Sequence, residues 1–79
     1  MESRIAALLV KLADKAGGAT DAGETVINMR ITKQDIAEMV GTTVETAIRV
    51  MSRFKKSGLI ADKNGRIAIK DLEAMKALI

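Results

Sequence analysis

The sequence predicts a mainly α-helical fold with a small antiparallel β-hairpin, arranged as a winged helix-turn-helix. Two short helical patterns are separated only by residues 41–43, and a glycine in so short a turn lets the second helix cross the first steeply. Asn64-Gly65 then lies between two runs of strand-forming residues, 59–61 and 66–69. An Asn-Gly pair in that position is the strongest short-range signal for a hairpin, which would be the wing.

The chain has 79 residues, which is enough for one domain and too few for two. No internal repeat or low-complexity segment divides it. We therefore assign residues 1–79 to a single domain, with the helix-turn-helix at about 32–57 and the wing at about 59–69.

The first helix is predicted over residues 2–16, where the apolar side chains recur at helical spacing. They are Ile5, Leu8, Leu9 and Leu12. Gly17-Gly18 is expected to stop this helix, and residues 17–24 are expected to form a flexible, turn-rich stretch. The β-branched residues of segment 25–31 then predict a short strand.

The two helices of the helix-turn-helix have recognisable ends. Thr32 is expected to begin the first, because Asp35 follows three residues later in the manner of a capping box, and Gly41 ends it. Its predicted inner face is Ile36, Ala37, Met39 and Val40. The second helix is expected over 44–56, capped by Thr43 and closed by Gly58. Its predicted core face is Ala47, Val50, Met51 and Phe54.

A last helix is predicted after the wing, with Asp71 as its N-cap. Its apolar residues are Leu72, Met75, Leu78 and Ile79.

The composition excludes several classes of function. The chain has no cysteine and no histidine, which removes disulfides, thiolate metal sites and the commonest general base, so we expect neither an enzyme nor a metal or cofactor site. Phe54 is the sole aromatic residue, whereas surfaces that bind RNA or single strands need rings on which bases stack. No apolar stretch is long enough to span a membrane, and we expect a cytoplasmic protein.

The positive charge is concentrated in one segment. Residues 43–66 carry six basic and two acidic side chains, a net charge of +4, whereas the rest of the chain carries −1. A basic stripe is the electrostatic footprint expected for contact with phosphates. A solvated helix face would show the same pattern, and charge alone leaves both interpretations open.

Glu45 and Arg49 are the candidate base-reading residues on the outward face of helix 44–56. Arginine can bridge guanine O6 and N7, and a carboxylate can accept from cytosine N4. The two residues are also spaced for an i, i+4 salt bridge, which would only support an exposed helix. Ile48 lies between them, where it could contact a thymine methyl group or simply sit at the edge of the core.

Several polar residues are candidates for phosphate contacts, which fix register without reading sequence. Thr43 and Thr46 lie at the start of the helix, where the dipole favours anions. The remaining candidates are Lys33, Ser52, Lys63, Asn64 and Arg66.

Residues 31–60 resemble the C-terminal domain of the Crp/Fnr regulators. The most specific parts are Val-Glu-Thr-x-x-Arg at 44–49 and Lys-Ser-Gly-Leu-Ile at 56–60. The resemblance implies a cytoplasmic, dimeric bacterial transcription factor that binds double-stranded operator DNA sequence-specifically, with recognition helix 44–56 in the major groove and RNA polymerase as a further partner. It also implies an N-terminal effector domain that this chain lacks, so the chain alone should be monomeric or weakly dimeric.

Carried over by position, the family's base-reading glutamate falls on Glu45 and its arginine on Arg49, and the phosphate-contacting hydroxyls fall on Thr43 and Thr46. Val44 matches the Fnr type, whereas Ile48 replaces the serine of that type. The resemblance therefore implies a TTGA-like operator core. The alternative is a winged helix used as a protein–protein interaction module without DNA binding, since a fold does not dictate its partner.

Overall fold

A computed structural model describes residues 1–19, 24–63 and 65–79 of the protein. Its four helices and four strands follow one another in this order: α1 (Glu2–Ala16), β1 (Gly17–Ala19), β2 (Thr25–Ile27), α2 (Lys33–Val40), α3 (Val44–Lys56), β3 (Ile60–Lys63), β4 (Arg66–Ile69) and α4 (Leu72–Ala77).

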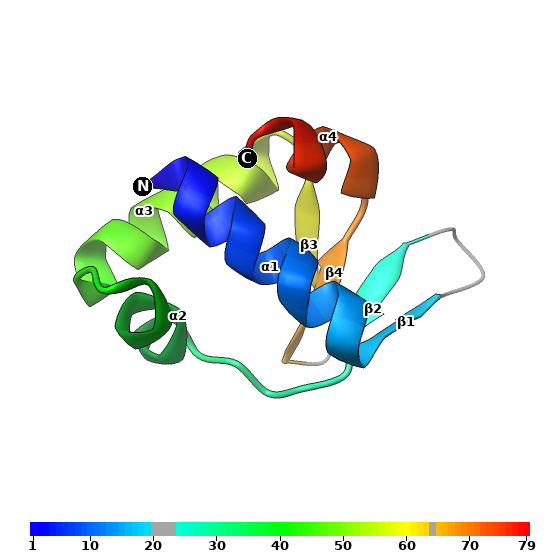
Figure 1. Cartoon of the computed structure of the whole chain (residues 1–79), viewed down its shortest axis with the longest axis horizontal. Helices are drawn as coiled ribbons and strands as arrows, with labels where there is room; N and C mark the ends of the chain where they lie inside the picture. The colour runs from blue at the N-terminus through cyan, green and yellow to red at the C-terminus, as the bar shows by residue number, and fades with distance from the viewer. Residues whose placement is uncertain (20–23, 64) are drawn as a thin grey trace.

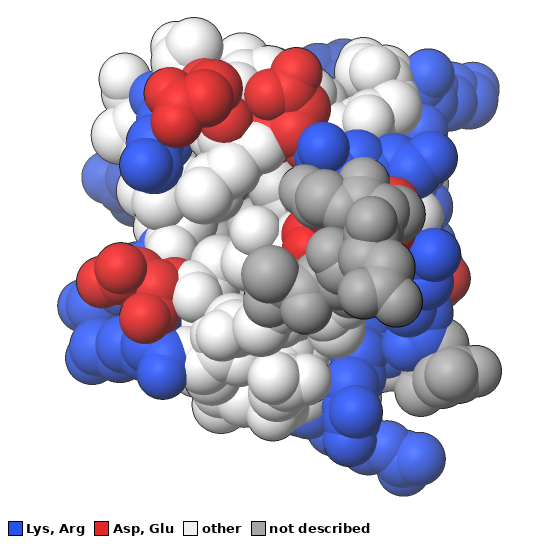
Figure 2. All heavy atoms as spheres, turned by 90° about the vertical axis from the view of Figure 1, so that its right-hand side faces the viewer, with Lys and Arg blue, Asp and Glu red and all other residues white. Residues whose placement is uncertain are grey.

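A small antiparallel sheet stands against the helices (Figure 1). Its strand order is β1-β2-β4-β3, so the wing hairpin β3–β4 is continuous with β2 and β1. Helix α1 runs across one face of the sheet, and α2 and α3 lie together at one end of it (Figure 1). From the side of the β1–β2 hairpin, Lys and Arg side chains lie at both edges of the molecule and extend furthest along the right-hand one (Figure 2).

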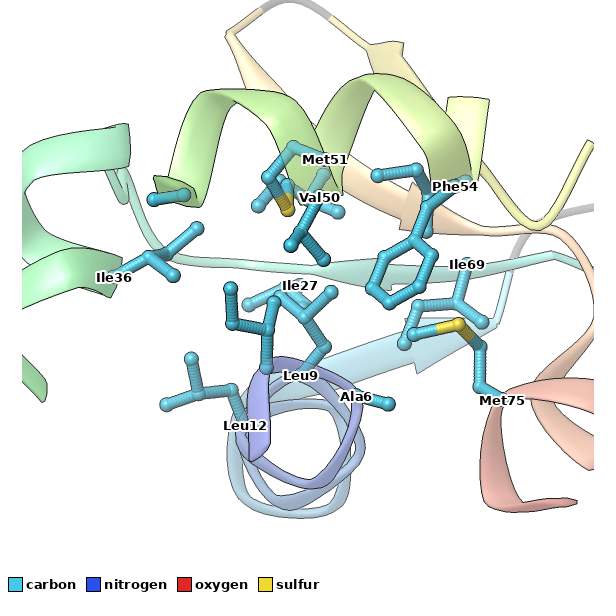
Figure 3. Packing of buried hydrophobic residues seen from close by; sticks show 14 of the residues in the cluster. Ala6, Leu9, Leu12, Ile27, Ile36, Val50, Met51, Phe54, Ile69 and Met75 are labelled. Carbon is cyan, nitrogen blue, oxygen red and sulfur yellow. The ribbon is translucent and has the colours of Figure 1, made fainter. Parts of the chain in front are cut away.

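The core is aliphatic, apart from one aromatic ring. Figure 3 shows Phe54 extending from α3 toward Ile69 of the sheet and Met75 of α4, and all three side chains are buried. The predicted core face of α3 is confirmed, because Ala47, Val50, Met51 and Phe54 are all buried. This packing fixes which side of α3 is left for a partner.

The sheet is larger than the expected hairpin, and this part of the prediction was wrong. Residues 17–19 form a strand instead of a loop, and residues 20–23 lie outside the described part of the chain. The strand expected over 25–31 ends at Ile27, because β1 pairs with it only from Gly17 onward, where α1 has just ended. The strand expected over 59–61 instead spans Ile60–Lys63, so that Lys63 pairs with Arg66 across a two-residue connection.

Two apolar assignments also need correction. Met39 was placed on the inner face of α2, but its side chain is 55% exposed. Each residue of a helix is turned by roughly 100° from the one before it, which puts Met39 outside the sector of Ile36, Ala37 and Val40. Leu78 and Ile79 follow the end of α4 and are exposed, so Met75 is the residue of that helix that is fully buried.

Candidate nucleic-acid interface

Local capping holds the helix pair in place. The capping box predicted at Thr32 is confirmed: the backbone N–H of Thr32 donates to Asp35 Oδ2, and the backbone N–H of Asp35 donates to Thr32 Oγ1, both at 3.0 Å. Gly41 then ends α2 with φ = 75°, a left-handed conformation that glycine adopts without steric cost. The chain can therefore leave α2 sharply and start α3 three residues later.

The N-terminus of α3 carries two linked hydroxyls. Thr43 Oγ1 accepts from the backbone N–H of Thr46 at 3.2 Å and donates to Thr46 Oγ1 at 3.0 Å. Thr43 is therefore occupied as the predicted cap. In this arrangement the Thr46 hydroxyl accepts from Thr43, and its own proton is not used in that bond.

The exposed face of α3 consists of Glu45, Ile48, Arg49, Ser52 and Lys56, all of which have exposed side chains. Ile48 is 43% exposed, so it is not buried in the core, and both a thymine contact and a partly covered place at the edge of the core stay open. Within the described part of the chain no ion pair joins Glu45 to Arg49, and neither pairs with another residue there. Both side chains are consequently presented to solvent, one turn apart.

Three of the six basic side chains of segment 43–66 are held by acids. Arg53 pairs with Glu2 of α1, Lys55 Nζ lies 2.5 Å from Asp62 Oδ2 of β3, and Lys63 Nζ lies 3.2 Å from Oε1 of the buried Glu24. The charge available to an outside anion is therefore smaller than the sequence suggests. Among the described residues, the basic side chains of this segment that form no ion pair are Arg49, Lys56 and Arg66.

The predicted phosphate contacts are distributed around the helix pair and the wing. Lys33 is exposed at the start of α2, and Ser52 is exposed on α3. Lys63 and Arg66 are opposite each other in the wing, and both side chains are exposed. Asn64 lies outside the described residues.

One basic residue close to this surface was missed by the sequence analysis. Lys55 lies in a groove between the helix pair and the wing, together with Lys33 and the wing residues Asp62 and Gly65. Its spacing of seven residues from Ile48 was the signal that could have identified it, because residues at i, i+4 and i+7 share one side of a helix.

The described part of the chain contains no group of three acidic, histidine or cysteine side chains that could hold a metal ion. None of its helices combines the length and the apolar character that crossing a bilayer requires.

A steeply crossed helix pair followed by a β-hairpin, with the polar face of the second helix left open, defines a winged helix-turn-helix domain. Residues 3–78 match the family model of the Crp-like helix-turn-helix domain. The chain belongs to this family, of the Crp/Fnr type.

Curated proteins that resemble the chain include regulators. The chain is 38% identical over 76 residues to the nitrogen fixation regulation protein FixK of Rhizobium meliloti, covering 95% of this chain and 34% of FixK. It is 36% identical over 77 residues to electron transport regulator A of Shewanella oneidensis, covering 98% of this chain and 30% of that protein. The chain thus spans about a third of the length of these relatives.

Solved structures share the fold over the whole chain. The CO-dependent transcription factor CooA of Carboxydothermus hydrogenoformans superposes with a TM-score of 0.89 at 29% identity, covering 98% of this chain and 35% of CooA. A CRP/FNR-family transcriptional regulator of Thermus thermophilus gives a TM-score of 0.84 at 28% identity, covering 99% of this chain and 39% of that one. The winged helix-turn-helix predicted from the sequence is confirmed.

Proposed function

We propose that this domain binds double-stranded DNA sequence-specifically, as the operator-binding part of a bacterial transcription regulator, with α3 in the major groove. The exposed face of α3 carries the proposal: it presents Glu45, Ile48 and Arg49 to solvent on a helix whose other side is fixed by the core. A helix-turn-helix reads base edges with the N-terminal residues of this helix. The relatives named as regulators support the same role.

Three side chains are proposed to read bases. The guanidinium fork of Arg49 would bridge O6 and N7 of a guanine, and the Glu45 carboxylate would accept from a cytosine N4 amine. Ile48 would contact a thymine methyl group, since it is apolar and exposed between the two charged residues. Together they favour an operator core of the TTGA type.

Phosphate contacts would come from both sides of the recognition helix. The candidates on the helix pair are the hydroxyl groups of Thr46 and the exposed Ser52 and the ammonium group of Lys33. Arg66 and Lys63 would reach phosphates from the wing, Lys63 only in competition with Glu24. Thr43 contributes mainly by capping α3, and Asn64 stays a candidate by sequence alone.

The remaining parts of the proposal concern the whole regulator. Because the chain spans about a third of its relatives, we infer that an effector domain and the dimerising element lie elsewhere in the protein. The full regulator would act as a cytoplasmic homodimer that binds RNA polymerase at its operators, and it would not be an enzyme.

The decisive experiment is the selection of bound sequences from a random duplex pool, using the chain fused to a dimerising coiled coil. We expect enrichment of a G·C-containing half-site, and Arg49→Ala should lose it at a cost of about 1–3 kcal/mol. Arg49→Lys should not restore it, because lysine offers a point charge instead of a planar fork. Lys11→Ala is the control, since Lys11 belongs to α1 and lines a pocket between α1 and α4.

Complete failure of the wild-type chain to bind random duplex at low salt would overturn the proposal. It would favour the protein–protein interaction module instead.

A further inference from the structure

A groove of about 470 Å³ separates the helix pair from the wing, and we call it the wing groove. Its floor includes Ile36, Met51 and Ile67, which are at most 6% exposed, and the half-buried Ile31 also lines it. Its rim carries the charged side chains of Lys33, Lys55 and Asp62. The two ammonium groups on the rim can bind the oxygens of an extended anion.

The rim is closed by an ion pair between helix and wing. Lys55 Nζ of α3 lies 2.5 Å from Asp62 Oδ2 of β3. The two side chains are 35% and 60% exposed, and an exposed pair of this kind contributes little free energy, so it can open at low cost. The carboxylate oxygen occupies the place on Lys55 that a phosphate oxygen would take, since both are anionic acceptors of the same ammonium N–H groups.

The groove adjoins the surface proposed to read bases. Ile48, Ser52 and Lys55 are spaced at i, i+4 and i+7 and therefore share one side of α3. Lys33, which begins α2, stands on the same groove. A DNA strand whose bases are read by Ile48 would carry its phosphates past Lys55.

We propose that the wing groove seats a phosphodiester strand of the bound duplex, and that Asp62 is the internal counter-ion which the phosphate displaces from Lys55. This inference rests on the proposed DNA binding and adds a phosphate-binding residue, Lys55, together with an acid that opposes it. Because the displaced pair is the same whatever the base sequence, Asp62 lowers the affinity for all DNA alike. The specific complex then depends more heavily on the base contacts of α3.

The test measures binding of the chain to a short random-sequence duplex by fluorescence anisotropy over a range of salt concentrations. Asp62→Asn should strengthen binding by about two- to fivefold at low salt, the range expected when an exposed ion pair no longer competes. In a chain that already carries Lys55→Met, the same change should have almost no effect. Adding Lys55→Met to Asp62→Asn should lower the salt slope by about one unit, and Lys55→Arg should retain it.

Glu73→Gln is the matched control, because Glu73 also pairs with a lysine, Lys76 on α4, at 3.9 Å, away from the wing groove. It should leave binding unchanged. Thermal melts of each variant establish that it is folded.

If Asp62→Asn raises the affinity for DNA equally with and without the Lys55 charge, Asp62 acts only by repelling DNA from a distance. That result would overturn the proposal that a phosphate displaces Asp62 from Lys55. Unchanged binding by Asp62→Asn would overturn it as well. A wild-type chain that binds no duplex at low salt would instead overturn the proposed function.

Discussion

Glu45 is an acid on the surface that is proposed to meet DNA. Its carboxylate repels the phosphates of any duplex bound there. Its side chain is exposed and forms no ion pair with another described residue, so it does not serve to hold α3 in place. A residue that opposes generic binding is explained if it accepts a hydrogen bond from a cytosine amine.

We therefore predict that Glu45→Ala loses discrimination at one base pair, while binding to random duplex stays equal or becomes stronger. The measurement is the sequence preference selected by the dimerised variant. Glu38→Ala removes an exposed acid from α2 and should keep the wild-type preference. If Glu45→Ala also keeps it, the glutamate reads no base.

The contact proposed between Ile48 and a thymine methyl group offers a second test of this surface. If it packs on a thymine methyl, replacing that thymine by uracil should weaken wild-type binding by about 0.8 kcal/mol, the value of one buried methyl-sized group. The Ile48→Ala variant should be nearly indifferent to the replacement. Titrations of both proteins with both duplexes give the coupling directly, and additive effects would contradict the contact.

The buried and exposed positions of α3 were predictable because a helix period of 3.6 separates them, as Phe54 and Arg49 illustrate. The ion pairs could not be predicted in this way. Arg53 and Glu2 are 51 positions apart, and Lys63 and Glu24 meet only because β2 lies in the same sheet as the wing. Which of the basic side chains remain free for phosphates is thus a property of the tertiary structure.

At the scale of elements, predictions succeeded where local chemistry decides. The caps at Thr32, Thr43 and Asp71 all formed as expected, because each is a contact between residues three apart. Strand β1 could not be predicted, since Gly17-Gly18 has low strand propensity and is extended only because β2 pairs with it. The wing therefore became one half of a four-stranded sheet.

Alanine substitutions at the two glycines of β1 should lower the stability of the domain to different extents. A Cβ added to Gly17 would stand 2.0 Å from the carbonyl oxygen of Ala13, which is helix backbone and cannot move aside. A Cβ on Gly18 would meet the Asn28 side chain at 2.9 Å, which can rotate away. Gly17→Ala should cost about 1–3 kcal/mol of unfolding free energy, as overpacking does, and Gly18→Ala much less. Urea denaturation of both variants decides this, and equal stabilities would contradict the close approach.

At the scale of the whole molecule, the charge and the fold indicate that one chain contacts DNA through a single, weakly charged surface. The net charge is +3, and part of the basic segment is neutralised by acids from α1, β3 and the residue before β2. A single α3 can enter a single major groove, so one chain can read one half-site. Affinity in the full regulator would then come largely from joining two such domains.

We predict that the 79-residue chain is monomeric in dilute solution and binds a single half-site weakly. Linking two copies converts the second contact into an intramolecular event, which raises affinity by about 10²- to 10⁴-fold if the half-sites lie one helical turn apart. Sedimentation of the free chain gives its oligomeric state, and titrations of the free and coiled-coil-fused chains with a two-site duplex give the gain. Moving the half-sites by half a turn should abolish most of that gain, because the second domain would face the wrong side of the duplex. A tight dimer of the free chain with nanomolar operator binding would show that the domain carries its own dimer interface and does not depend on the rest of the regulator for it.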